Sequence, residues 1–316
     1  IGSREDIERV PIERLQAFWR KFYQPDNAVL IVAGKFDEAA ALAKINELYG
    51  QIPRPARKLE KTYTVEPAQD GEREVILRRA GDVQTIGFAY HICAGSHEDL
   101  APLRVLADTL DADQTGRLYK ALVATKLATS VSASADANCE PGTFDVTVET
   151  RMDQSLDAIR AKTTEVLDKL GEQTFTDEEV NRAKNDFARG FEMMLNDSTR
   201  LATRLSGSVA QGDWRLLFLE RDRMAKVSPA DVKRVAAYYL KPSNRTVGLF
   251  IPTGQPDRAV IPATPDLVAL LKDYQDTEEV AKGAAFEATY ANIEKHTQRS
   301  KLPVGMKLAL LPKVTR

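Results

Sequence analysis

The first sixty residues alternate between apolar faces and polar breaks. Apolar residues three and four positions apart predict a helix over residues 11–23 that buries one face. That face consists of Leu15, Phe18, Trp19 and Phe22. Pro25 should end this helix, and the apolar residues at 28–32 then predict a buried strand. A second helix is expected over residues 37–49.

Later segments have the two-residue period that is typical of strands with one buried face. In one of them, Ile86, Phe88 and Tyr90 alternate with smaller or polar residues. The expected strands cover residues 72–79, 84–92, 128–135, 143–150 and 245–251. A turn at Gly81 separates the first two of these strands.

Helix-start signals mark the segments between and after these strands. Ser96 with Asp99 predicts a capping box for a helix to Leu110, and Thr176 with Glu179 predicts a second one. The core-facing stripe after Thr176 consists of Val180, Phe187, Phe191 and Met194. Further helices are expected at residues 117–125, at 156–170, and after Ser198 and Ser228.

The order of these elements predicts the fold class. Strict alternation of strand and helix is missing, which argues against a Rossmann fold or a (β/α) barrel. Paired strands followed by grouped helices favour an α+β fold, with a largely antiparallel sheet and helices packed on one face.

Two segments of the chain share one pattern at a fixed offset. Pro25 and Pro242, which are 217 residues apart, each follow a helix stripe. Each is followed two residues later by an asparagine, Asn27 or Asn244, and then by an apolar segment. We interpret this pattern as one supersecondary unit that is used twice.

The repeat predicts how the chain is organised. The second copy has a long stretch before it, from Glu72 onward, whereas the first copy has almost none. We therefore expect residues 1–60 to be the C-terminal end of a first, truncated subdomain and residues 61–252 to be a complete second one. Residues 253–300 are expected to be an interdomain linker, and residues 301–316 to open the next subdomain with a hairpin.

The composition excludes some classes of function but does not identify the function. The chain has 316 residues and a net charge of −2, from 44 Lys+Arg and 46 Asp+Glu. This balance argues against a general nucleic-acid binder, because no basic field attracts phosphates. The longest apolar run, residues 28–33, is far too short to span a bilayer. Cys93 and Cys139 are expected to be unpaired thiols.

Four segments carry a resemblance to a known family. They are residues 1–8 (Ile-Gly-Ser-Arg-Glu-Asp-Ile-Glu), the Phe-Tyr-x-Pro-x-Asn-Ala run at 22–34, residues 116–123, and residues 302–312. In order and spacing they resemble the pitrilysin (insulinase) zinc peptidases, over about 300 residues. The resemblance implies processing-peptidase-like α+β subdomains, repeated to form two halves of a clamshell around an unfolded peptide substrate.

The resemblance also implies where the chemistry lies. The family's first subdomain carries H-x-x-E-H, in which two histidines bind zinc and the glutamate activates the zinc-bound water. This chain has only His91, His97 and His296, and none fits that motif. In the family the motif precedes the Ile-Gly-Ser segment with which this chain opens. No catalytic or metal-binding residue is therefore carried over, and the substrate-binding residues are left unassigned.

Other candidate sites in the sequence are weaker. His91, His97 and Cys93 could meet as a zinc or thiol site, but each is more readily explained as a strand or helix-start residue. Asp108, Asp111 and Asp113 lack the loop spacing of a calcium site and are interpreted as a solvated helix end. The serines at 130–134 have no histidine after them until His296, and isolated glycines such as Gly81, Gly87 and Gly116 form no phosphate loop.

Three hypotheses follow from the sequence. In the first, the chain is part of a zinc-dependent peptidase, inactive alone, whose complete subdomain helps enclose and position a peptide. In the second, the parent is a catalytically inactive relative that acts as a peptide-binding or assembly subunit. The third, a stand-alone binding module, is disfavoured because both ends cut through units. Zinc is expected in the intact parent and not in this chain. The family's large bacterial members suggest the periplasm, although no residue here indicates a compartment.

Overall fold

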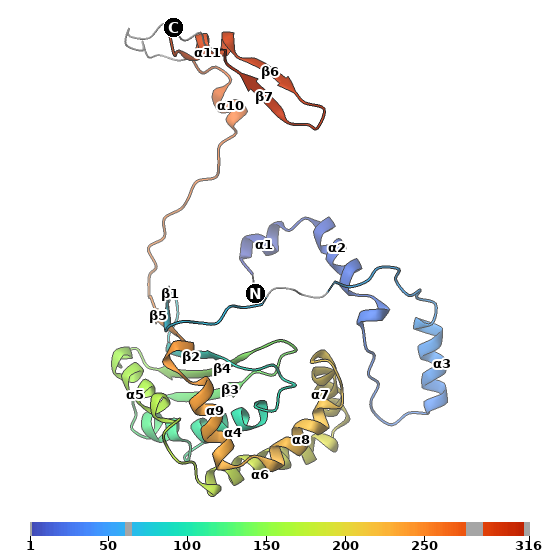
Figure 1. Ribbon diagram of the computed structural model, residues 1–316, viewed down its shortest axis with the longest axis vertical. Coiled ribbons are helices and arrows are strands. Elements are labelled where there is room, and N and C mark those ends of the chain that lie inside the picture. The colour runs from blue at the N-terminus through green and yellow to red at the C-terminus, as the bar shows by residue number, and fades with distance from the viewer. Residues whose placement is uncertain (1, 61–64, 276–286, 313–316) are drawn as a thin grey trace. The chain divides into compact units, whose positions relative to one another are not determined.

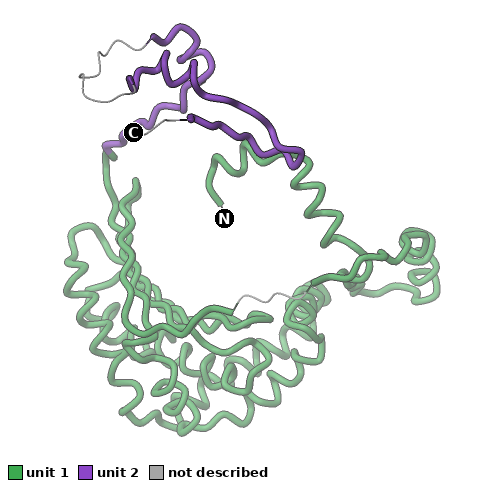
Figure 2. Tube along the Cα trace, turned by 45° about the horizontal axis from the view of Figure 1, so that its top comes forward, with its two compact units in different colours: residues 1–256 green, residues 257–316 purple. Residues whose placement is uncertain are grey.

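The computed structural model describes residues 2–60, 65–275 and 287–312. It divides into two compact units, Ile1–Pro256 and Asp257–Arg316 (Figure 2). Parts of the expected second subdomain at 61–252, of the linker at 253–300 and of the last segment at 301–316 lie outside the described residues. The four-part division of the chain therefore stays a prediction.

A five-stranded mixed sheet forms the centre of the first unit. Its strands are β1 (Arg73–Arg79), β2 (Gln84–His91), β3 (Ser130–Ala135), β4 (Thr143–Thr150) and β5 (Arg245–Pro252). The spatial order is β1-β5-β2-β4-β3. Only the β1–β5 pair is parallel within this sheet, which confirms the expectation of a largely antiparallel sheet. β1 and β2 flank the Gly81 turn without pairing, because β5 lies between them.

The helices that follow the strands cover one face of this sheet (Figure 1). They are α4 (Leu100–Asp111), α5 (Leu156–Lys169), α6 (Asp177–Leu195), α7 (Ser198–Ala210), α8 (Leu216–Lys226) and α9 (Pro229–Tyr239). α4 packs against β3 and also against α6, α8 and α9, so it is the central helix of the layer. The α+β class with helices on one face is confirmed.

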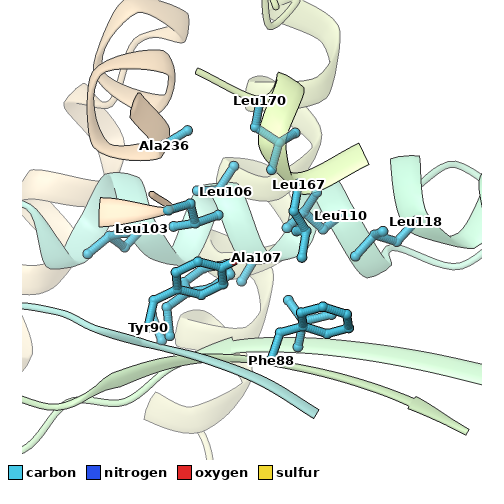
Figure 3. Packing of buried hydrophobic residues seen from close by; sticks show 14 of the residues in the cluster. Phe88, Tyr90, Leu103, Leu106, Ala107, Leu110, Leu118, Leu167, Leu170 and Ala236 are labelled. Atoms are coloured by element: carbon cyan, nitrogen blue, oxygen red, sulfur yellow. The ribbon is translucent and has the colours of Figure 1, made fainter. Parts of the chain in front are cut away.

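The core lies between the sheet and α4. Phe88 and Tyr90 of β2 point from the sheet toward α4, which carries Leu103 and Leu106 (Figure 3). These four side chains are at most 1% exposed. Leu167 of α5, which is equally buried, closes the same core from the side. Burying such side chains is the main stabilising contribution to the unit.

Helix starts agree with the sequence at two places and differ at two others. Thr176 and Ser228 form capping boxes that begin α6 and α9. The box expected at Ser96 is wrong, because α4 begins after Asp99. The carboxylate of Asp99 accepts hydrogen bonds from Arg234 and Tyr239 of α9 and does not cap α4. The helix expected at 117–125 is a five-residue π-helix, Tyr119–Val123.

Residues 2–60 contain the two expected helices and lack the expected strand. The helices are α2 (Ile12–Phe22) and α3 (Glu38–Tyr49), and a short helix α1 (Arg4–Arg9) precedes them. The prediction of a strand at 28–32 is wrong: these residues are extended but have no strand partner among the described residues. A strand exists only when a neighbour accepts its ladder hydrogen bonds, and sequence period alone cannot supply that neighbour.

The repeat at offset 217 is present in local structure. α2 and the short 3₁₀ helix Pro25–Asn27 have the same bounds, shifted by 217, as α9 and the 3₁₀ helix Pro242–Asn244. Corresponding residues of the two copies differ in burial. If one unit is used twice, Leu15 of α2 and Val232 of α9 should be equally buried; this expectation is wrong, because Leu15 is 50% exposed and Val232 is fully buried.

The second unit has little regular structure. It contains α10 (Leu267–Leu271), α11 (Tyr290–His296), β6 (Gln298–Lys301) and β7 (Lys307–Leu310). β6 and β7 pair as an antiparallel hairpin, which begins three residues earlier than the hairpin expected at 301–312. Among the described residues, no helix combines the length and the apolar character needed to cross a bilayer.

Candidate functional site

The sheet has one face that the helices leave uncovered, here called the open face. Alternate strand residues form rows across it, and neighbours in a row belong to paired strands. The central row is Ser132, Thr147, Gly87 and Gly248, and the next row is Ser134, Asp145, Ala89 and Thr246. On β2, β3 and β4 the side chains on this face are small or polar, in contrast to the aromatic and branched residues of the core face, whereas β1 and β5 add the apolar side chains of Val75, Leu77 and Phe250.

Glycines give the open face its flat centre. Gly87 and Gly248 are register partners on the adjacent strands β2 and β5. A Cβ atom added at either position would meet no heavy atom within 4 Å. Packing in the described structure therefore does not require glycine here, and the backbone of two neighbouring strands is left accessible.

A cavity of about 690 Å³ lies at the end of the sheet where β2 finishes. His91, Cys93 and Asn244 line it, together with Tyr238 and Tyr239 at the end of α9. The Nδ1 atom of His91 lies 3.5 Å from the Glu66 carboxylate, which reaches it from the segment before β1. The cavity thus combines aromatic walls with a small number of polar groups.

Asp99 links this cavity to the helical layer. Its carboxylate accepts hydrogen bonds from the Tyr239 hydroxyl at 2.9 Å and from Arg234 Nη2 at 2.7 Å. Burial alone would raise the pKa of Asp99, but the hydrogen bonds from Arg234 and Tyr239 hold that pKa below its ordinary value. Burial raises the pKa of the Cys93 thiol, which favours the neutral and less nucleophilic form.

The structure does not assemble the histidines and the thiol into a catalytic or metal site. His97 uses Nδ1 to accept a hydrogen bond from the backbone N–H of Asp99, at 3.1 Å. His91 and Cys93 share the end cavity. No group of three or more His, Cys, Asp or Glu residues that could hold a metal occurs within residues 2–60, 65–275 and 287–312. Cys93 and Cys139 are both free thiols.

The aspartates and serines that the sequence offered as candidate site residues have structural roles or lie on the sheet surface. Asp111 accepts a hydrogen bond from the backbone N–H of Ala133 on the edge strand β3, at 2.8 Å. Asp108 is half-buried, and burial raises the pKa values of both carboxyls. Only Asp113 of the three is exposed, so the interpretation as a solvated helix end holds for that residue alone. Ser130, Ser132 and Ser134 lie on the open face.

A buried ion network at Arg245 was not predicted from the sequence. Its guanidinium, 5% exposed at the start of β5, donates to Asp168 of α5 and to Glu72, both at 2.6 Å. Burial raises the pKa of the nearby Tyr90 hydroxyl to about 12. These residues are far apart in the chain and share no motif, so only the folded structure brings them together.

Solved structures with this fold include peptidase domains. A protease from Helicobacter pylori superposes with a TM-score of 0.74 at 22% identity, covering 79% of this chain and 62% of that chain. The inactive peptidase domain of a candidate zinc protease from Bordetella parapertussis is 35% identical, with a TM-score of 0.52, and covers 58% of this chain and 99% of its own. The class of protein is thus a domain of peptidase architecture.

The family follows from the sequence match. Residues 9–187 match the family described as the Peptidase M16 inactive domain, so the chain belongs to that family. Zinc protease PqqE of Helicobacter pylori is 23% identical over 249 residues, which are 78% of this chain and 56% of that protein. An uncharacterized zinc protease of Streptomyces coelicolor is 25% identical over 264 residues.

These matches confirm the resemblance to the pitrilysin-type zinc peptidases, in a chain that lacks the zinc motif. The names of the relatives support zinc as the metal of the parent family. The chain spans about half the length of the curated relatives that it matches.

Proposed function

We propose that residues 61–252 serve as the non-catalytic subdomain of a pitrilysin-type zinc peptidase and help to enclose and position a peptide substrate. In this arrangement residues 1–60 are the end of the preceding subdomain and residues 301–316 are the beginning of the next one. Residues 253–300 are the linker between residues 61–252 and that next subdomain. The catalytic zinc and its H-x-x-E-H ligands belong to another part of the parent protein. The match to the inactive-domain family carries this proposal.

The open face supports a role in positioning peptide. A flat sheet surface with Gly87 and Gly248 at its centre lets an extended chain approach the backbone closely. The small polar residues of β3 and β4 beside this centre offer hydrogen bonds without selecting one side chain, which suits a peptidase that accepts varied unfolded peptides.

The intact protein provides the test. Gly87→Trp places a bulky side chain above the open face, and Gly87→Ala is the small control at the same site. We expect the tryptophan variant to lower kcat/KM for an unfolded peptide at least about tenfold while the bound zinc stays unchanged. Lys169→Trp, on the exposed side of α5, controls for a surface tryptophan. Full activity of Gly87→Trp would contradict the positioning role.

Zinc analysis separates this proposal from an inactive relative. After dialysis, this chain alone should hold no stoichiometric zinc and should not cleave peptides. The intact parent should hold one zinc per protein and lose activity with a chelator. A parent that binds peptide without zinc or cleavage would favour the assembly-subunit alternative. Tight zinc in this chain, lost in His91→Ala, would overturn the view that its own residues form no metal site.

A further inference from the structure

A second cavity, of about 550 Å³, has a different chemistry. Its walls come from α4, from α7 and from the loop between β3 and β4. The polar side chains that line it include Arg104, Arg204, Asn138 and Gln211. The hydrophobic pattern of the sequence gives no sign of it, because these residues are up to about one hundred positions apart.

Two guanidinium groups at this cavity share one carboxylate. Arg104 of α4 forms an ion pair with Oε1 of Glu220 on α8. Arg204 of α7 donates from Nη2 to Oε2 of the same carboxylate, at 3.1 Å. Glu220 is 15% exposed, so this pairing lies in the protein wall and not on a mobile surface chain. The cluster of three groups carries a net charge of one positive unit.

Nearby charges compensate this excess only in part. Asp136 lines the cavity from the loop after β3, where it is exposed and its charge is screened by solvent. Burial, and to a lesser extent the Arg204 charge, lower the pKa of Arg104 to about 10 against the opposing effect of Asp136. Arg104 therefore stays protonated near neutral pH, beside a second cation, with room for one more anion.

Donors remain for that anion. Each guanidinium has five N–H groups, and the two oxygens of Glu220 cannot accept from all ten. The wall beside them is closely packed. A Cβ at Gly95 would lie 2.6 Å from Oε1 of Gln211, and the Gly95 N–H donates to the Asn138 carbonyl at 2.8 Å. The Asn138 backbone is thus tied to Gly95, and the Gln211 side chain lies close to the same residue.

We propose that this cavity binds a single carboxylate group of a peptide, either an acidic side chain or the free C-terminus, through Arg104 and Arg204. Glu220 is the residue that holds the two guanidinium groups side by side. A monoanion matches the one positive charge of the cluster, whereas a doubly charged phosphate would be repelled by Glu220 and Asp136. The site needs only this chain, so it does not depend on whether the parent is an active peptidase.

Binding measurements on the whole chain test the proposal. The probes are a blocked peptide with a free C-terminus, the same peptide amidated, an amidated peptide with an internal glutamate, and inorganic phosphate. We expect at least one of the two carboxylate-bearing peptides to bind more tightly than the amidated neutral peptide and phosphate. Which of the two binds identifies the source of the carboxylate.

Charge variants assign the binding to this cavity. Arg204→Gln should weaken carboxylate binding at least about tenfold, because it removes charge-assisted donors. Arg200→Gln is the matched control: Arg200 lies one turn earlier on α7, is mostly exposed and pairs with Asp197. Glu220→Gln keeps an oxygen acceptor for the guanidinium groups and removes the competing negative charge, so it should tighten binding. Thermal unfolding verifies that each variant is folded.

The outcomes decide the question in either direction. Weaker binding in Arg204→Gln, with Arg200→Gln unchanged, supports the site even where Glu220→Gln fails to fold. Absence of binding by every carboxylate probe would overturn the proposal. So would tighter binding of phosphate than of carboxylate, or equal affinities in the wild-type chain and Arg204→Gln.

Discussion

Asn27 and Asn244 make the same hydrogen bond at two places 217 residues apart. Asn27 Nδ2 donates to the Phe22 carbonyl at 2.9 Å, and Asn244 Nδ2 donates to the Tyr239 carbonyl at 2.8 Å. In both cases a proline has ended the helix, and the asparagine satisfies a carbonyl that the helix leaves open. Asn244 also donates to the His91 carbonyl on β2, at 2.9 Å, so only this copy is tied to the sheet.

That difference predicts unequal effects of one substitution. Asn244→Ala should lower the free energy of unfolding by about 1–3 kcal/mol, because it leaves two carbonyls without their donor. Asn27→Ala is the matched control and should cost less than about 0.5 kcal/mol, since its carbonyl is exposed and can be hydrated. Urea denaturation followed by circular dichroism measures both. Equal losses would show that the link to β2 contributes nothing.

The sequence predicted what local periodicity and capping chemistry determine. Helices α2, α5, α6 and α9 and the five strands of the sheet lie close to their expected positions. The predictions from sequence were wrong where a contact with a distant residue determines the local structure. Asp99 looked like part of a capping box, but Arg234 and Tyr239 occupy its carboxylate. Residues 28–32 looked like a strand, but no described strand pairs with them.

Site prediction was limited for the same reason. The sequence contains no zinc motif, and the family resemblance supplied the peptidase class. The Arg104–Glu220–Arg204 cluster joins α4 to the consecutive helices α7 and α8, which lie far from it in the chain, and its residue types are common on helix surfaces. Only the packing of α4, α7 and α8 turns them into one group.

Acid should weaken the unit through Glu179. Arg117 donates to both oxygens of this carboxylate, at 2.8 and 2.9 Å. These hydrogen bonds lower the pKa of Glu179 from 4.5 to about 2. Because the pKa is lower in the folded state, the stabilisation is present above pH 4.5 and is lost as the pH falls toward 2.

Glu179→Gln should therefore lower stability by about 1–2 kcal/mol at pH 7 and reduce the loss of stability between pH 4.5 and 2. Glu165→Gln is the control, because Glu165 also has its pKa lowered to about 2, by Lys169 and Lys162, but is fully exposed to solvent. Its substitution should change stability far less. Parallel pH profiles for Glu179→Gln and the wild-type chain would disprove the role of Arg117.

Phe191 and Phe187 test the inward face of α6. Phe191 is 8% exposed, and its ring centroid lies 6.2 Å from that of Phe187, which is only partly buried. Phe191→Ala should cost about 3–5 kcal/mol, while Phe187→Ala should cost clearly less because its site is partly hydrated. Denaturation midpoints rank the two. A larger loss for Phe187→Ala would mean that the buried face of α6 is rotated toward Phe187.

The contrast between α2 and α9 predicts where the chain exposes apolar surface. Phe18 and Trp19 of α2 are 57% and 58% exposed, whereas their counterparts at offset 217, Val235 and Ala236 of α9, are at most 2% exposed. The stripe of α9 is covered by α4, and nothing in the described structure covers the stripe of α2 in the same way. An uncovered stripe of this kind binds hydrophobic dyes and promotes self-association.

The two helices should therefore respond in opposite ways to the same kind of change. Phe18→Glu combined with Trp19→Glu should lower dye fluorescence and self-association in sedimentation experiments, because both side chains leave an exposed face. The unfolding midpoint of the sheet-containing part should stay the same. Val235→Glu, the counterpart on α9, should instead raise dye binding and unfold that part, since it buries a charge without a partner. If the variant with both α2 substitutions bound as much dye as the wild-type chain, the exposed apolar surface would have to lie outside Phe18 and Trp19. The inferred difference in burial between α2 and α9 would then be wrong.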